Sequence, residues 1–133
     1  MPSITDPEDI NIPIMQRTPE AILKAAKNVE NTESNSDYIC NILHESGYFT
    51  EEEMNMYKEC SISEICSQLD ERGWKTVTDI SNLQNGDIII VNNGETIRIY
   101  AGNNSWYTVG NSEIQQGSEN WSENISWVAY RPN

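Results

Sequence analysis

The spacing of apolar residues changes at Trp74, and this change constrains the fold more than any other feature of the sequence. Before Trp74, apolar residues recur at the three-to-four-residue spacing of amphipathic helices. After it, short runs rich in β-branched and aromatic residues are separated by Asn/Gly turn signals, a pattern typical of antiparallel hairpins. Helices first and an antiparallel sheet second predict the α+β class, with the N-terminal helices packed on one face of a small sheet.

Capping signals place the expected elements more closely. A helix near 19–30, a helix ending at Gly47 and two helices that begin with capping boxes are expected. The signals are Thr18 with Pro19, Gly47, Thr50 with Glu53, Ser61 with Glu64, and Gly73. The expected strands are 87–91, 96–100, 105–109 and 126–131. The turns between the first three are Asn92-Asn93-Gly94 and Gly102-Asn103-Asn104, and both have hairpin composition.

The chain has the length of one domain with one core, preceded by an arm. Residues 1–17 hold three prolines and predict an extended N-terminal arm, and 18–133 predict the folded domain. The arm carries an alternating apolar patch, Ile10, Ile12, Ile14 and Met15. Such a patch either docks on a sheet edge or partner, or remains a flexible acidic tail.

The charge balance limits the partners. The 8 basic and 21 acidic residues give a net charge of -13, which repels phosphate backbones and anionic lipids. Neither nucleic acid nor a membrane is an expected partner, whereas a basic protein is.

No apolar run is long enough to span a membrane, and no export signal is visible. The three cysteines are expected to be reduced, which favours a cytoplasmic or particle-associated protein.

Several motifs in the second half resemble one family. The run Gln84-Asn85-Gly86-Asp87-Ile88 follows a Gly73-Trp74 pair, and the hairpin Ile97-Arg98-Ile99-Tyr100-Ala101-Gly102-Asn103 leads to Trp106-Tyr107. The chain ends on Val128-Ala129-Tyr130-Arg131-Pro132. These segments are similar to the second half of the NlpC/P60 and CHAP cell-wall amidases and endopeptidases. The resemblance implies a papain-like, NlpC/P60-type domain over residues 18–133.

The resemblance also implies where catalysis would occur. Enzymes of this family use a Cys at the start of the first core helix, a His on the first hairpin strand and a polar residue on the next strand. The matching positions here are Asn35, Thr96 and Thr108. An amide is no nucleophile and a Thr hydroxyl is no base at neutral pH. The resemblance therefore implies a catalytically inactive member without a cofactor, a binding or regulatory module linked to peptidoglycan or to an active hydrolase.

Two alternatives remain open. Cys40 and His44 lie four apart, so both occupy one helix face, and a thiolate–imidazole pair would make an active cysteine amidase or endopeptidase of peptidoglycan peptides. Against this, Cys40 lies too close to Gly47 to match the family nucleophile without a deletion inside the helix. A third hypothesis is a structural subunit that assembles through residues 1–17.

The expected ligand contacts come from the aromatic residues and from the positions that match the family's catalytic residues. Trp106 and Tyr107, with Trp121 and Trp127, resemble a platform for a cell-wall peptide or glycan, or else fill the core. The predicted binding set is Trp106, Tyr107, Asn35 and Thr96. The spacing of Cys60 and Cys66 matches no common zinc site, so no metal is expected. Asp87 resembles a structural turn aspartate.

Overall fold

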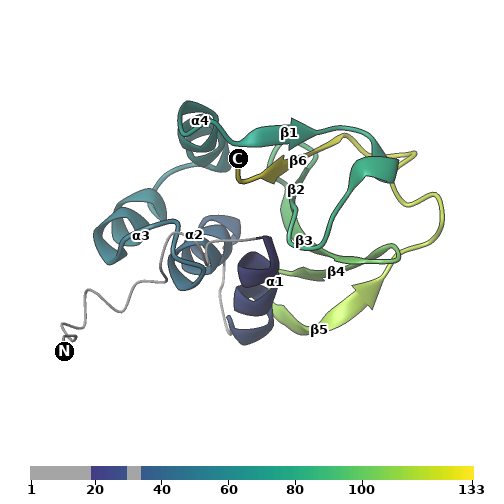
Figure 1. Ribbon diagram of the computed structural model, residues 1–133, viewed down its shortest axis with the longest axis horizontal. Helices are drawn as coiled ribbons and strands as arrows, with labels where there is room; N and C mark the ends of the chain where they lie inside the picture. Colours follow the sequence, from purple (N-terminus) through teal and green to yellow (C-terminus); the bar gives the residue numbers. More distant parts are fainter. Residues whose placement is uncertain (1–18, 30–33) are drawn as a thin grey trace.

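The computed structural model describes residues 19–29 and 34–133 (Figure 1). The helices are α1 (Pro19–Asn28), α2 (Asn35–Glu45), α3 (Glu51–Tyr57) and α4 (Ile62–Glu71). The strands are β1 (Lys75–Val77), β2 (Ile88–Val91), β3 (Thr96–Gly102), β4 (Ser105–Thr108), β5 (Asn111–Gln116) and β6 (Trp127–Arg131), and a short 3-10 helix, η3, spans Ile80–Asn82. The predicted arm, 1–17, and the predicted cap Thr18 lie outside the described residues.

All strands form one antiparallel sheet with the order β1-β6-β2-β3-β4-β5. The helices pack against one face of the sheet, so the predicted α+β class is confirmed (Figure 1). The last strand, β6, inserts between β1 and β2 and is thereby paired on both sides, next to the edge strand β1. Within the described residues no helix has the length and apolar character needed to cross a bilayer.

The local signals predicted most elements. Both capping boxes form, at Thr50 with Glu53 and at Ser61 with Glu64. Strands β1 and β5 were not predicted. β1 has only three residues, of which one is buried, and β5 carries only one large apolar residue, Ile114, which is half exposed. Both are edge strands, so their backbone pairing rather than an alternating apolar pattern defines them.

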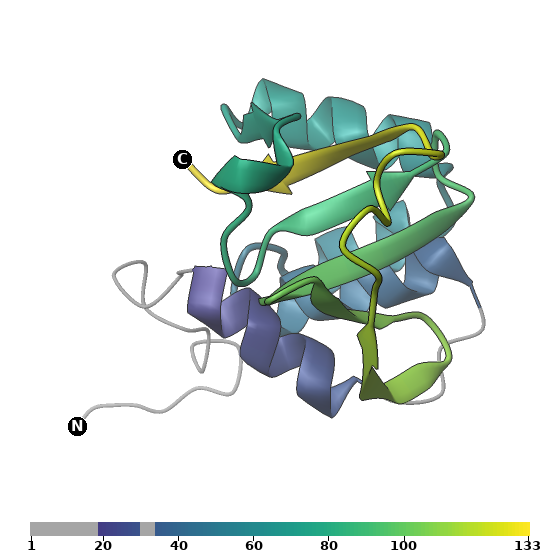
Figure 2. The same cartoon turned by 90° about the vertical axis from the view of Figure 1, so that its right-hand side faces the viewer.

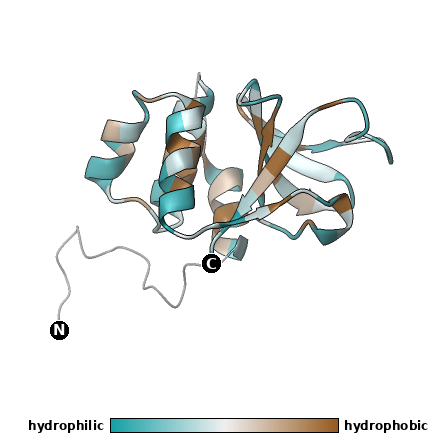
Figure 3. Cartoon of the chain, turned by 90° about the horizontal axis from the view of Figure 1, so that it is seen from above, coloured by the Kyte–Doolittle hydropathy of each residue, from teal (hydrophilic) through white to brown (hydrophobic). Residues whose placement is uncertain are grey.

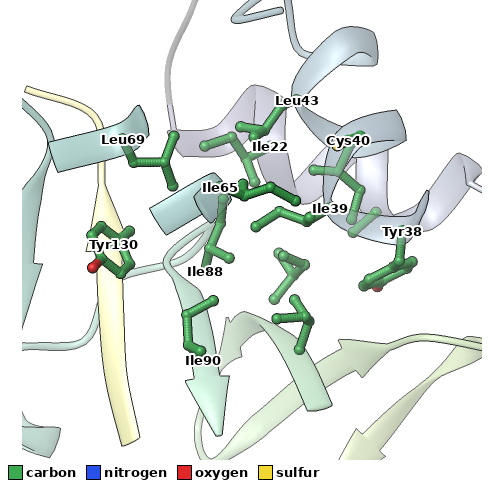
Figure 4. Packing of buried hydrophobic residues seen from close by; sticks show 14 of the residues in the cluster. Ile22, Tyr38, Ile39, Cys40, Leu43, Ile65, Leu69, Ile88, Ile90 and Tyr130 are labelled. Carbon is green, nitrogen blue, oxygen red and sulfur yellow. The ribbon is translucent and has the colours of Figure 1, made fainter. Parts of the chain in front are cut away.

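The core has two layers, one on each face of the sheet. The larger cluster fills the space between the helices and the sheet (Figure 4) and includes Ile22, Ile39, Leu43, Ile65, Ile88 and Ile97. Both the helices and the strands carry hydrophobic positions (Figure 3). The smaller cluster lies on the opposite face and consists of Val77, Ile89, Val91, Tyr100 and Ala129. The segment that joins β5 to β6 crosses this second face (Figure 2). Burial on both faces explains the uninterrupted apolar run in β2.

An ion pair fastens the start of β2 to β6. The Asp87 side chain is fully buried, and its carboxylate accepts hydrogen bonds from Arg131 Nε at 2.8 Å and Nη2 at 2.7 Å. It also accepts the backbone N–H of Gln84 at 2.8 Å, as a turn aspartate does. The hydrogen bonds that Arg131 donates to this carboxylate raise the pKa of Arg131. Sequence reasoning singled out Asp87 but gave it no partner across the sheet.

Candidate functional site

The start of α2 contacts the turn between β2 and β3. Ser34 caps the helix by accepting the Asp37 N–H, and Asn35 is the first helical residue. The Asn35 side-chain amide donates to the carbonyl oxygens of Glu95 at 2.9 Å and of Gly94 at 3.3 Å. Its Oδ1 atom is buried and has no hydrogen-bond partner among the residues that the structure describes. The predicted nucleophile position therefore lies beside the backbone that leads into β3.

Thr96 and Thr108 are neighbours on β3 and β4. Their hydroxyl oxygens lie 3.4 Å apart, and Thr108 donates its own hydroxyl proton to the Ile97 carbonyl at 2.8 Å. Thr96 is therefore the donor between the two hydroxyls. Alternation along the strands puts both on the face opposite Ile97 and Tyr107, which belong to the helix-side core. Asn35 bonds to the carbonyls of residues 94 and 95, not to either hydroxyl.

This arrangement has limited chemistry. The amide of Asn35 and the hydroxyls of Thr96 and Thr108 donate and accept hydrogen bonds, but none of the three changes protonation near neutral pH. A nucleophile activated by a neighbouring base, which acyl transfer requires, is not formed by these three side chains. What they offer is hydrogen bonding.

The alternative pair, Cys40 and His44, is not arranged as a nucleophile and base. Cys40 is fully buried in the helix-side core (Figure 4), and burial, with a smaller contribution from the Asp37 carboxylate, raises its pKa to about 12. A reactive thiol needs the opposite shift. The Nδ1 atom of His44 lies 3.1 Å from the Phe49 carbonyl oxygen, so that ring nitrogen already has a backbone partner.

Thiol alkylation tests this description. Under native conditions we expect iodoacetamide to modify partly exposed Cys60 first and Cys40 last, on the order of 100-fold more slowly, because the Cys40 thiol reacts only after the core opens. Peptide mass spectrometry at successive times gives each rate. The Cys40→Ala variant serves as the control for the assignment of the slow phase. Native alkylation of Cys40 as fast as that of Cys60 would contradict the buried position.

Trp106 and Tyr107 do not form a shared exposed platform, and this part of the predicted binding set is corrected. They are 7% and 9% exposed, and as successive strand residues they point to opposite faces of the sheet. Tyr107 belongs to the helix-side core, and Trp106 packs edge-on against Trp121 with ring centroids 5.1 Å apart. The alternative prediction, that the aromatics fill the core, describes these two residues, while Trp121 and Trp127 are partly exposed.

Sequence reasoning missed Arg98 as a candidate site residue. Its guanidinium carbon lies 4.2 Å from the ring centroid of Trp106 and 5.6 Å from that of Trp121. The only signal in the sequence is a charged residue between Ile97 and Ile99 in an otherwise apolar strand. That signal alone is typical of any strand with one solvated face, so it does not distinguish a site.

The described residues form surface grooves, and two of them are well defined. The first, of about 460 Å³, lies between α4 and strands β2 and β6, beside the turn that Asn35 contacts. Its lining residues are Ile62, Ser63, Cys66, Ile90, Asn93, Ser126, Trp127, Val128 and Tyr130, and none is an acid or a strong base. Burial raises the pKa of the Cys66 thiol to about 11 and that of the Tyr130 phenol to about 12, so both are neutral at pH 7. The second, of about 440 Å³, is polar and lined by residues 75–79, residues 81–84 and Arg131.

No protein-family model matches this chain, and no curated protein or solved structure matches it significantly. Over the residues that the structure describes, no group of three or more His, Cys, Asp and Glu side chains is placed to hold a metal ion. The fold and the site define the molecule as an α+β domain whose helices cover one face of an antiparallel sheet, with hydrogen-bonding side chains where α2 meets the sheet.

Proposed function

We propose that this chain is a catalytically silent NlpC/P60-like domain of papain-like type that acts as a binding or regulatory module. In this proposal Asn35, Thr96 and Thr108 occupy the places of the family's Cys, His and orienting residue. The domain recognises a cell-wall peptide or a protein associated with peptidoglycan, such as an active hydrolase. The domain does not cleave the ligand that it binds.

One observation carries the proposal. The start of α2 lies against the backbone that leads into Thr96, because Asn35 donates to the Glu95 carbonyl at 2.9 Å, and Thr96 and Thr108 meet on adjacent strands. The first residue of α2 thus touches the backbone one residue before Thr96, which supports matching these positions with the family's nucleophile and base, although the Thr96 hydroxyl points to the sheet face opposite the helices. The side chains at these places hydrogen-bond but do not titrate, which supports binding without chemistry.

The groove between α4 and β6 supports a binding role next to the same helix start. Its size is in the range of ordinary ligand pockets, and its lining combines apolar walls with serine and asparagine side chains. The net charge of -13 favours neutral or basic ligands over polyanions. A peptide with a neutral side chain in the groove fits both conditions.

The register of the family can be tested by restoring its chemistry. In the Asn35→Cys/Thr96→His variant we expect the new imidazole to lower the pKa of the thiol at position 35 by about one unit or more relative to Asn35→Cys alone. The measurement is the pH dependence of alkylation at that residue, followed by mass spectrometry. The wild-type chain is expected to release no fragments from peptidoglycan or peptide amides in the same buffers.

The matched control is Ser36→Cys/Thr96→His. The Ser36 hydroxyl donates to the Cys60 carbonyl at 2.7 Å, so a thiol there leaves the helix in a different direction. Its pKa should not respond to the histidine. Equal thiol pKa values at position 35 with and without the histidine would reject the register and, with it, the family assignment.

A further inference from the structure

We propose that Arg98 and the aromatic residues around it form a binding site for the carboxylate of a ligand, such as the free C-terminus of a peptide. This inference rests on the proposed binding role and not on the family register, because it uses Thr96 and Thr108 only as hydroxyl groups beside Arg98 and uses no residue of α2. It concerns the sheet face opposite the helices (Figure 2), where the segment between β5 and β6 crosses the strands.

The first observation is that Arg98 has no acidic partner. The other two arginines in the described ranges are paired, Arg72 with Glu53 and Arg131 with Asp87. The guanidinium of Arg98 makes neither an ion pair nor a hydrogen bond with any backbone group or side chain that the structure describes. In a chain with 21 acidic and 8 basic residues, a carboxylate is the easiest partner to supply. A guanidinium left without one keeps its N–H donors for another acceptor.

The second observation is that the guanidinium is held in place without using those donors. Its central carbon lies 4.2 Å from the Trp106 ring centroid, and this cation–π contact leaves its N–H groups free of hydrogen bonds to the described residues. Trp106 is itself fixed, because Gly117 packs directly on its ring and Trp121 meets its edge. Trp121 in turn donates its indole N–H to Asn104 Oδ1 at 3.2 Å. A fixed planar donor needs little reorganisation to bind.

The third observation concerns the surroundings. Arg98 pairs with Thr108 across β3 and β4, and Thr96 shares the same face, so two hydroxyls lie beside the arginine. The Thr96–Thr108 contact is long, at 3.4 Å, and is easily exchanged for a ligand oxygen. The partly exposed ring of Trp121 adds apolar surface next to the charge. Burial lowers the pKa of Arg98, which shows that its charge has lost solvation.

These features select a carboxylate among anions. The two oxygens of a carboxylate match the planar fork of an arginine in a bidentate arrangement. A phosphate dianion would meet twice the repulsion from a chain of net charge -13. A single carboxylate next to an apolar group meets less repulsion and gains contact with Trp121.

The test titrates the full chain with acetyl-Ala-Ala and, separately, with its C-terminal amide. NMR follows the Arg98 Nε–H and the indole N–H groups of Trp106 and Trp121, and calorimetry gives the affinity. We expect the free carboxylate to bind at least about tenfold more tightly than the amide, since a hydrogen bond to a charged group is lost with the amide. Inorganic phosphate is expected to bind more weakly than the dipeptide.

Arg98→Gln should reduce binding of the carboxylate to the level of the amide, and Arg98→Lys should weaken it several-fold because the charge remains but the fork is lost. Lys75→Gln, which removes an exposed charge on the edge strand β1, is the control and should bind as the wild type does. Thermal unfolding of each variant verifies folding, and Arg98→Lys carries the test if Arg98→Gln does not fold.

Equal binding of acid and amide, unchanged binding by the variants, or tighter binding of phosphate would overturn the proposal. None of these results changes the thiol pKa at position 35, so failure here is separable from failure of the family register.

Discussion

Asp87→Ala is expected to lower the free energy of unfolding by about 3–5 kcal/mol, because it leaves the Arg131 guanidinium partly buried without its counter-charge. The carboxylate is fully buried and accepts two hydrogen bonds from Arg131 and one from the Gln84 N–H. All three are lost together. Since a domain of this size has a total stability of roughly 5–15 kcal/mol, the variant should be close to unfolding at 37 °C. Urea denaturation followed by circular dichroism measures the change.

The matched control for this prediction is Asp79→Ala, which removes the same charge from an exposed site. Asp79 caps the short 3-10 helix by accepting the Ser81 N–H at 3.0 Å. Loss of such a cap costs about 0.5–2 kcal/mol. If both alanine variants lose the same stability, the ion pair to Arg131 does not hold β2 and β6 together.

Gly86→Ala is expected to destabilise the domain by about 2–5 kcal/mol, which combines left-handed backbone strain with overpacking. Gly86 has a φ of +91°, and a Cβ atom there would lie 1.8 Å from the carbonyl oxygen of Pro19, the first residue of α1. The obstacle is backbone, so either α1 or the start of β2 must move. Chemical denaturation gives the loss, and hydrogen exchange of α1 amides shows whether the helix detaches.

Gly110→Ala separates the two contributions to that loss. Its φ is +77°, but apart from its two chain neighbours no described residue has an atom within 4 Å of the added Cβ. Only the backbone strain of about 1–2 kcal/mol is expected. A loss at Gly86 no larger than the loss at Gly110 would show that the contact with Pro19 contributes nothing.

Local signals were sufficient wherever neighbouring residues decide the structure. The capping boxes at Thr50 and Ser61 begin helices because the cap and its partner lie three residues apart, and no distant contact is needed. The turn before β3 is similar, since Asn92, Asn93 and Gly94 all adopt positive φ values, as their types favour. β5 was missed because pairing with β4, not its own composition, makes it a strand.

The candidate site depended on contacts between distant residues. Asn35 was selected by its position before Gly47, but only the fold shows that its amide reaches the carbonyl of Glu95, sixty positions later in the chain. Trp106 and Tyr107 are adjacent in sequence, and the strand turns them to opposite faces of the sheet, which removes the shared platform. The burial of Cys40 likewise appears only once α2 packs against its neighbours.

The sequence by itself determined the α+β class, the four helices, the hairpin β2–β3 and the acidic charge, because periodicity, caps and turn residues act over a few positions and charge is a sum. The tertiary structure alone decided which side chains meet. It placed Asp87 against Arg131 and placed Arg98 over the Trp106 ring without an acidic partner. The three arginines that the structure describes have the same chemistry, so their sequence identity does not decide which of them is paired. The reason is that the ion pair joins residues 44 positions apart, and the position of Arg98 over Trp106 depends on how β3 and β4 pair and on the packing of Trp121 from the segment between β5 and β6. A local pattern holds no information on these contacts.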